Sequence, residues 1–316
     1  MLISEELGIK YPIFCGAMAR ITDAKFASVI SNAGGLGIIA SGDLTSDELK
    51  KEVRLIKTLT KNPYAVNVML QSPYCDDLVD MLIEEEVPII IFGAGMPFKY
   101  MDKLKNTNIK VFVIVSNSSF IKRLERYNLF GYIVEGMESG GHIGKDASLP
   151  LLQTIKKEFP NARLIAAGGF ATGQSLNAAL MLGAKGIQLG TRFLASSEAP
   201  VSDLYKEEII KAKDNKTVIT GEKFGLPVRV LRNEFSSNYK ELEEKANDRL
   251  ELEILAVGSL KRAINGDVKN GSLMCGEIAS VIDEIKPVEK IFEDIIKEAK
   301  EANEAYLKEF EKIKIL

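Results

Sequence analysis

The sequence is short of the residues on which several classes of protein depend. It has no tryptophan, one histidine and three cysteines. The cysteines, Cys15, Cys75 and Cys275, are odd in number and far apart, which does not suit a secreted disulfide framework. Their positions also lack the spacing of a zinc site, so we expect no metal there. This cysteine usage favours the reducing cytoplasm.

A surplus of positive charge is absent as well. The formal net charge is −3, whereas general nucleic-acid binding needs clustered Lys and Arg in excess. No apolar run reaches the roughly 18 residues of a membrane helix, and the first residues do not resemble a secretion signal. We therefore expect a soluble, cytoplasmic protein with neither nucleic acid nor a membrane as its partner.

What the sequence does contain is a regular alternation of short apolar runs and amphipathic stretches, which is typical of buried parallel strands joined by helices. Eight such units suggest a closed (β/α)8 TIM barrel, an α/β fold. A doubly wound open sheet is the alternative, but the usual GxGxxG turn after the first strand is missing. The predicted strands are residues 13–18, 36–41, 65–70, 88–94, 110–116, 131–135, 163–168 and 186–193.

The alternation stops after Phe193, which predicts a second structural unit. Residues 196–280 are predicted to form an inserted, mainly helical cap or substrate domain, with helices near 203–213 and 239–249. The barrel domain then comprises residues 1–195 and 281–316. Residues 287–316 show one apolar face at helical spacing, which predicts a helix on the barrel exterior or, alternatively, an oligomer contact.

Two glycine turns are predicted to bind a phosphate. Strand seven ends in Ala167, Gly168 and Gly169, and strand eight leads into Gly190 and Thr191. Barrels of this type often hold phosphate in the loops after these strands, where glycine lets backbone N–H groups come close. The alternative is that the glycines only relieve crowding in tight turns.

Three further segments carry polar or small residues at strand ends. The small residues Gly16 and Ala17, next to Met18, leave room for a flat ring. Asn67 interrupts an apolar strand and needs a partner, either a ligand or neighbouring backbone. Cys15 is interpreted as a small core residue. His142 lies in a glycine-rich loop after strand six, where it is a candidate acid, base or hydrogen-bond donor, while Lys145 either assists it or is solvated.

Taken together, these segments resemble the FMN-dependent enoyl-[acyl-carrier-protein] reductase II (FabK) family, within the wider group of nitronate monooxygenases (2-nitropropane dioxygenases). The GGHxG loop and the AAGG and GTRF turns are common to the group. The segments at 66–73, 92–101 and 266–280 are reductase-like. The resemblance is carried by YPIFCGAM (11–18), SNAGGLGIIASG (31–42), VNVMLQSP (66–73), FGAGMPFKYM (92–101), VEGMESGGHIGK (134–145), IAAGGFATG (165–173), QLGTRF (188–193) and GDVKNGSLMCGEIAS (266–280).

The resemblance implies an oxidoreductase of fatty acid biosynthesis in which NAD(P)H reduces FMN and the flavin reduces a trans-2-enoyl thioester carried by acyl carrier protein. His142 would position or polarise the thioester. It also implies activation by a monovalent cation, at a site not yet placed, and we expect a homodimer. The predicted FMN-binding residues are Gly16, Ala17, Met18, Asn67, Glu135, Ala167, Gly168, Gly169, Gln188, Gly190 and Thr191.

The chain departs from the family pattern at three places. GAMAR at 16–20 replaces GGMAW, GLP at 225–227 replaces GHP, and CGEIAS at 275–280 replaces AGQxAG. Arg20 and Leu226 are expected to line the substrate entrance, so these changes bear on substrate and on NADH or NADPH preference. Two other functions stay open: a nitronate monooxygenase that uses O2, and a non-enzymatic flavin-binding protein.

Overall fold

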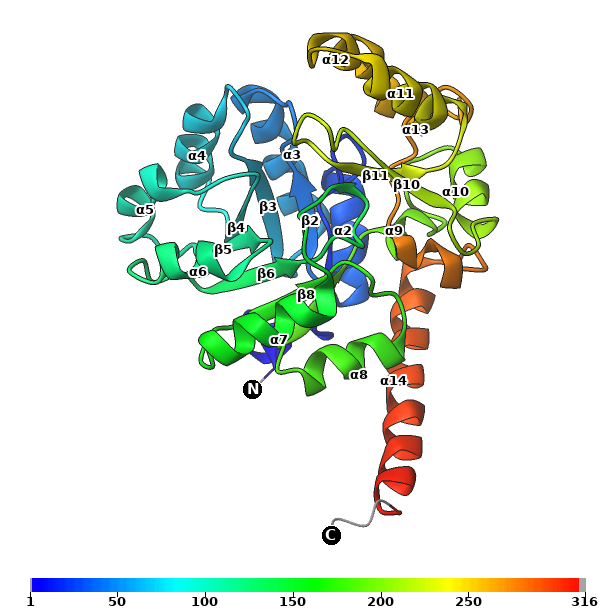
Figure 1. The fold of residues 1–316 in the computed structure, drawn as a ribbon. Coiled ribbons are helices and arrows are strands. Elements are labelled where there is room, and N and C mark those ends of the chain that lie inside the picture. Colours follow the sequence, from blue (N-terminus) through cyan, green and yellow to red (C-terminus); the bar gives the residue numbers. More distant parts are fainter. Residues whose placement is uncertain (1, 313–316) are drawn as a thin grey trace.

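The predicted barrel is confirmed in a computed structural model that describes residues 2–312 (Figure 1). Eight parallel strands pair in the order β1-β9-β8-β6-β5-β4-β3-β2. The ring closes where Cys15 N–H donates to the Leu36 carbonyl and Leu36 N–H donates to the Ile13 carbonyl, both at 3.0 Å. The strands are β1 (Ile13–Cys15), β2 (Gly37–Ala40), β3 (Tyr64–Met69), β4 (Ile89–Gly93), β5 (Lys110–Val115), β6 (Gly131–Glu135), β8 (Leu164–Ala167) and β9 (Gly186–Leu189).

Each strand coincides with a predicted one, although most are shorter. The largest difference is at the last strand, which we expected to run to residue 193. β9 ends at Leu189, and α9 (Thr191–Leu194) follows it directly. Gly190 lies between the two, so the chain turns at the predicted phosphate-binding glycine. A helix therefore begins at Thr191 where the sequence pattern had suggested more strand.

Alternate residues of each strand point into the barrel, as the period of two requires. The lower interior is filled by one apolar cluster that includes Phe14, Ile38, Ala65, Ile91 and Phe112. The other face of each strand packs against the surrounding helices in a larger cluster. Because the lower interior is filled with side chains, only the top of the barrel is open to a ligand.

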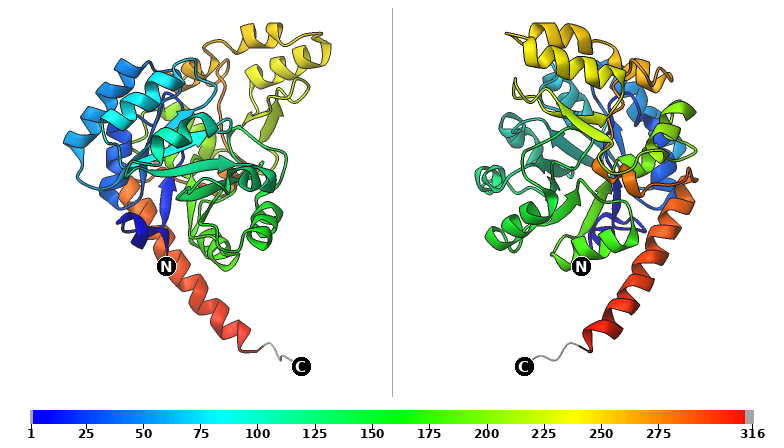
Figure 2. Two further views of the ribbon diagram at one scale, coloured as in Figure 1. Left: turned by 90° about the vertical axis from the view of Figure 1, so that its left-hand side faces the viewer. Right: turned by 45° about the vertical axis from the view of Figure 1, so that its right-hand side comes forward.

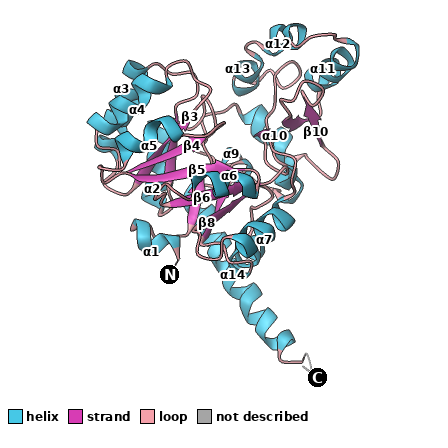
Figure 3. Ribbon diagram, turned by 60° about the vertical axis from the view of Figure 1, so that its left-hand side comes forward, coloured by secondary structure: helices cyan, strands magenta, loops and turns pink. Residues whose placement is uncertain are grey.

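Helices cover the outer face of the strands, seen clearly in Figure 3. Their starts follow from side-chain caps: Asp23 accepts from Phe26 N–H, and Thr172 accepts from Ser175 N–H. The third helix is capped by Thr45, whose side chain accepts from Glu48 N–H. The helices are α1 (Ile3–Leu7), α2 (Ala24–Ala33), α3 (Ser46–Leu59), α4 (Cys75–Glu84), α5 (Phe98–Leu104), α6 (Ser118–Leu124), α7 (Ser148–Glu158) and α8 (Gly173–Met181).

Residues between β9 and the last helix form a layer over one end of the barrel (Figure 1). They include two strands that the sequence pattern did not reveal. These strands form a three-stranded antiparallel sheet in the order β10-β11-β7, in which β7 (Gly141–His142) belongs to the loop after β6. The elements are α10 (Asp203–Ile210), β10 (Thr217–Thr220), β11 (Val228–Leu231), α11 (Glu234–Lys245), α12 (Leu250–Ala256), α13 (Ser259–Ile264) and the 3-10 turn η1 (Glu277–Val281). The domain boundaries themselves stay a prediction.

The last helix, α14 (Val288–Phe310), begins against the barrel and then extends away from it (Figure 2). Its first half buries Val288, Ile291, Ile295 and Ala299, which belong to the apolar face that the helical spacing predicted. The predicted continuation over residues 313–316 lies outside the described residues. Within residues 2–312, no helix is long and apolar enough to cross a membrane.

Candidate functional site

A cavity of about 410 Å³ opens at the carboxyl end of the barrel strands. All twelve residues predicted to contact cofactor or substrate, His142 among them, line this one cavity. The sequence had placed them at the ends of five different strands. Because the carboxyl ends of barrel strands meet on one face, the fold brings them together.

The floor of the cavity is the uppermost inward-facing layer of the barrel. It combines residues that the sequence singled out with Gly93 and Ile114, which it did not. The sequence could have predicted these two, because alternate residues of a strand share a face. Gly93 and Ile114 lie two residues beyond the inward-facing Ile91 and Phe112. The floor consists of Asn67, Gly93, Ile114, Glu135, Ala167 and Gln188.

The two glycine turns form one wall, and the first of them has backbone that only glycine adopts easily. Gly168 and Gly169 have φ of +86° and +82°. A Cβ on Gly168 would lie 2.8 Å from the Gly136 carbonyl oxygen. A Cβ on Gly190 would meet nothing nearer than the Met18 sulfur at 4.0 Å. Neighbouring backbone therefore requires glycine at position 168. No protein atom requires glycine at position 190, and the open space beside it can accept a ligand.

The chain returning from the cap completes this wall. Gly276 N–H donates to Thr191 Oγ1 at 3.0 Å, which leaves the Thr191 hydroxyl hydrogen to donate elsewhere. Glu277 N–H donates to the Glu138 carbonyl at 3.0 Å. Met274 and Gly276 both line the cavity. The reductase-like segment at 266–280 thus belongs to the site, a position that its sequence did not disclose.

Asn67 and Glu135 are the polar groups of the cavity floor. The Asn67 amide donates to the Ile91 carbonyl at 3.1 Å, which is the backbone partner that the sequence had left as an alternative. Its own carbonyl oxygen is left for the cavity. Burial raises the pKa of Glu135 to about 7, because no cation offsets the loss of water around the carboxylate. Near neutrality Glu135 therefore exists in part as a neutral acid that can donate a hydrogen bond.

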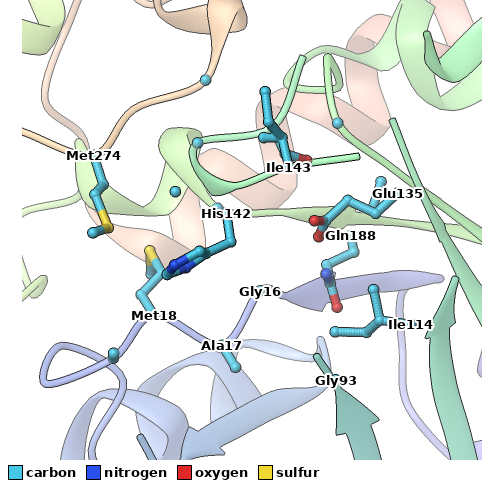
Figure 4. Close-up of a pocket in the computed structure, with 18 of the residues that line it drawn as sticks. Gly16, Ala17, Met18, Gly93, Ile114, Glu135, His142, Ile143, Gln188 and Met274 are labelled. Atoms are coloured by element: carbon cyan, nitrogen blue, oxygen red, sulfur yellow. The ribbon is translucent and has the colours of Figure 1, made fainter. Parts of the chain in front are cut away.

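His142 is positioned by the cap as much as by the barrel. It lies on β7, where it pairs with Val228 of β11. Its ring points toward Met18 and Met274 at one side of the cavity, with Glu135 and Gln188 at the other (Figure 4). Desolvation by the surrounding protein lowers the pKa of His142 from its ordinary value of 6.5. The imidazole is therefore mainly neutral at pH 7 and can donate one hydrogen bond while accepting another.

A buried arginine that the sequence reading missed holds the His142 loop to the cap. Arg229 of β11 donates through Nε to the Met137 carbonyl at 3.0 Å and through a terminal nitrogen to Thr217 Oγ1 at 3.0 Å. The same nitrogen forms an ion pair with Glu277 at 2.7 Å. The guanidinium fork thus connects the loop, the cap sheet and the returning chain. Nothing in its local sequence marks it, since the partners are far apart along the chain.

The remaining candidates lie away from the cofactor cavity. Cys15 is buried in the cluster between strands and helices, and desolvation raises the pKa of its thiol, as expected for an unreactive core residue. Lys145 is not among the lining residues. Arg20 and Leu226 line a neighbouring cavity under the cap. Arg20 has a left-handed backbone, with φ of +63°, and is paired with Asp43.

Comparison with known proteins places the chain in a family. The model of the nitronate monooxygenase family matches residues 1–78 and 74–298. FabK from Thermotoga maritima has a solved structure that is 44% identical, with a TM-score of 0.93 over 96% of this chain and 97% of that one.

The curated relatives bear two different activities in their names. A probable nitronate monooxygenase of Staphylococcus saprophyticus is 30% identical over 93% of this chain and 96% of its own. A 5-hydroxy-7a-methyl-1-oxo-octahydro-1H-indene-4-carboxyl-CoA dehydrogenase of Mycobacterium tuberculosis is 34% identical over 73% of this chain, which spans 66% of that relative. The grouping inferred from the motifs is thereby confirmed: the chain belongs to the nitronate monooxygenase family of FMN-dependent oxidoreductases.

Proposed function

We propose that this protein binds FMN and catalyses the NAD(P)H-driven reduction of trans-2-enoyl thioesters, as an enoyl-[acyl-carrier-protein] reductase II. The observation that carries the proposal is the likeness to FabK from Thermotoga maritima over nearly the whole of both chains, at 44% identity. The Mycobacterium tuberculosis relative adds support, because its name specifies a CoA thioester as substrate.

The shape of the cavity fits FMN. A Cβ on Gly16 would make an ordinary contact with Gln188 at 3.6 Å, so the protein itself leaves room there, and glycine keeps the surface flat beside the barrel floor. The open space before Gly190, the positive φ of Gly169 and the Thr191 hydroxyl suit a phosphate. Asn67, Glu135 and Gln188 offer both acceptors and donors to the edge of a flavin ring. When bound and reduced, FMN would supply the hydride.

The task that remains for the protein is to hold the thioester and to manage a proton. His142 is the titratable side chain of the cavity that lies on a strand paired with the cap, since β7 pairs with β11. A neutral imidazole can donate a hydrogen bond to the thioester carbonyl, which makes the neighbouring carbon-carbon double bond more electrophilic. The returning chain contributes Met274 and Gly276 to this face, on which His142 is exposed.

Anaerobic rapid mixing tests this function. NADH or NADPH should bleach the flavin absorbance of the purified protein, and crotonyl-CoA added afterwards should restore it under argon. A reduced flavin that crotonyl-CoA never reoxidises would contradict the proposed reaction.

The second candidate is a nitronate monooxygenase, which the family match and the Staphylococcus saprophyticus relative favour. In that reaction His142 would act beside an alkyl nitronate, and O2 would reoxidise the flavin. Rapid oxygen uptake with propyl-2-nitronate, together with slow NAD(P)H oxidation, would select this function over the reductase. Bound FMN with turnover of neither substrate class would instead indicate a flavin-binding protein without enzymatic activity.

The remaining proposals concern the protein's substrate carrier, its location in the cell and its oligomeric state. We propose that acyl carrier protein delivers the substrate, that the protein acts in the cytoplasm, and that it forms a homodimer. Tyr306, Leu307 and Phe310 are large apolar residues exposed on the projecting part of α14, which suits a contact between subunits. Light scattering after gel filtration tests the dimer, with the Leu307→Lys variant as the comparison.

A further inference from the structure

A second cavity, of about 320 Å³, lies under the cap and beside the cofactor cavity. Its walls are mostly apolar side chains from the cap helices and from the loop between β10 and β11. Phe235 and Leu252 are 6% and 1% exposed, so the floor of this cavity is firmly packed. The apolar residues used in the argument below are Phe224, Leu226, Phe235, Leu252 and Ala256.

This second cavity adjoins the first. His142, Leu260 and Met274 line both of them, so the candidate catalytic histidine stands at the junction. A substrate whose reacting group lies beside His142 can therefore extend a chain in one of two directions. The barrel side leads to the polar floor that suits the flavin, and the cap side leads to the apolar walls.

The charges at the rim of this cavity are predominantly positive. Arg20, Arg249 and Lys261 contribute cations, whereas Glu253 is the one acidic residue among the described lining residues. Arg249 is paired with Glu253 at 2.5 Å, and Arg20 with Asp43. An apolar interior with a cationic rim is complementary to a molecule with an apolar chain at one end and phosphate at the other.

We propose that the cap cavity binds the acyl chain of the substrate and limits its length, with Arg20 and Lys261 facing the phosphate groups of the carrier arm. This inference rests on the proposed reductase function, because that function supplies a thioester between the two ends. Moving a methylene from water into a cavity with apolar walls is favourable, because it removes apolar surface from water. Each buried methylene contributes about 0.8 kcal/mol, which corresponds to about a fourfold increase in affinity. Affinity should therefore rise by this factor with each added methylene until the cavity is full.

Calorimetric titration of the FMN-loaded protein with decanoyl-CoA and butyryl-CoA tests the proposal without turnover. Wild-type protein should bind decanoyl-CoA at least tenfold more tightly. Ala256→Phe fills the cavity and should abolish that preference while leaving butyryl-CoA within twofold. Ile254→Phe is the matched control, because Ile254 belongs to the same helix but is 66% exposed and lies outside the cavity.

Equal affinity for the two thioesters in the wild type, or equal behaviour of Ala256→Phe and Ile254→Phe, would overturn the assignment. If Ala256→Phe fails to fold, Phe224→Ala enlarges the cavity instead and should shift the preferred chain from decanoyl toward dodecanoyl; no shift would contradict the proposal. A loss of ADP-ribose affinity in Ala256→Phe, with decanoyl-CoA unaffected, would assign the cavity to the nicotinamide coenzyme.

The two proposals fail separately. Crotonyl-CoA has a chain too short to depend on the cap cavity, so its failure to reoxidise the flavin counts against the reaction alone. Loss of decanoyl-CoA binding in Ala256→Phe would still place an acyl chain under the cap. Conversely, reduction of crotonyl-CoA without any chain-length preference leaves the reaction standing and removes the assignment of the cavity.

Discussion

The two cavities that meet at His142 are built in different ways. The cofactor cavity consists of strand ends, glycine turns and the top inward-facing layer of the barrel, so backbone geometry determines most of its shape. The cap cavity consists mainly of side chains from the loop between β10 and β11 and from the three helices that follow it, α11, α12 and α13. The first type of site can stay constant while the second varies. This division fits a family whose members share a flavin and bear different activities in their names.

The largest expected effect comes from placing a charge in the backbone-built cavity. Gly169→Asp adds a carboxylate where phosphate is predicted to bind, at a φ of +82°, and should weaken FMN binding by at least about 100-fold through charge repulsion and strain. Fluorescence titration of the flavin-free protein with FMN measures this. Gly8→Asp is the control, since Gly8 has a φ of +71° and no atom within 4 Å of an added Cβ, far from either cavity. Unchanged FMN affinity in Gly169→Asp would refute the position of the phosphate.

The next effect concerns the junction between the cavities. His142→Ala should keep its FMN, because the phosphate wall and barrel floor are untouched, yet flavin reoxidation by crotonyl-CoA should slow by about 10- to 100-fold. Stopped-flow absorbance gives the rate, and the flavin content after gel filtration gives the occupancy. Loss of FMN from this variant would assign His142 a structural role instead.

The contrast between the cavities also explains what the sequence could predict. Strand periodicity and glycine turns identified the barrel and the wall at Gly168, Gly169 and Gly190, because parallel strands impose their pattern locally. The polar helices of the cap show no such pattern, and the two cap strands, β10 and β11, were not predicted. Whether Val228 pairs with His142 depends on a fold-wide arrangement that no local window contains.

Arg229 shows the same limit at the level of one residue. Its three partners come from the loop after β6, from β10 and from η1. A single arginine in an apolar strand usually suggests an edge or an exposed face, yet this one is 3% exposed. Only the assembled structure shows that its Nε and one terminal nitrogen hold these three segments together.

Replacing Arg229 should therefore loosen the connection between the cavities. Arg229→Lys keeps the positive charge but loses the planar guanidinium group with its several donors. We expect reoxidation of the flavin by crotonyl-CoA to slow by about three- to tenfold while FMN stays bound. The chain has one histidine, so a tag-free sample gives a single imidazole signal in proton NMR. Because the loop would admit more water, the lowered pKa of His142 should move back toward 6.5.

The control for this variant is Arg232→Lys, three residues further along. Arg232 is exposed and donates through Nε to the Asn215 carbonyl at 3.1 Å. It should change neither the rate nor the histidine titration. An Arg229→Lys protein with a slower rate but an unmoved histidine pKa would indicate that Arg229 stabilises the fold without positioning His142.

The last effect is expected at the cavity floor, where it changes the dependence of stability on pH and not the rate. Burial raises the pKa of Glu135 from 4.5 to about 7, so between these values the folded protein keeps a proton that the unfolded chain has released. The stabilisation is complete below pH 4.5 and is lost as the pH rises through about 7. Wild-type, flavin-free protein should therefore lose on the order of 1–3 kcal/mol between pH 5 and pH 8 relative to Glu135→Gln.

Urea unfolding at the two pH values measures this difference, with Glu251→Gln, at an exposed position on α12, as the control. His142 contributes with the opposite sign: its lowered pKa makes the folded protein more stable as the pH rises toward 6.5. That contribution is present in the wild type and in Glu135→Gln alike, so it cancels in the comparison. A difference between the two proteins that does not change with pH would show that the carboxylate of Glu135 is solvated, and the floor of the cofactor cavity would then be wetter than the cap cavity beside it.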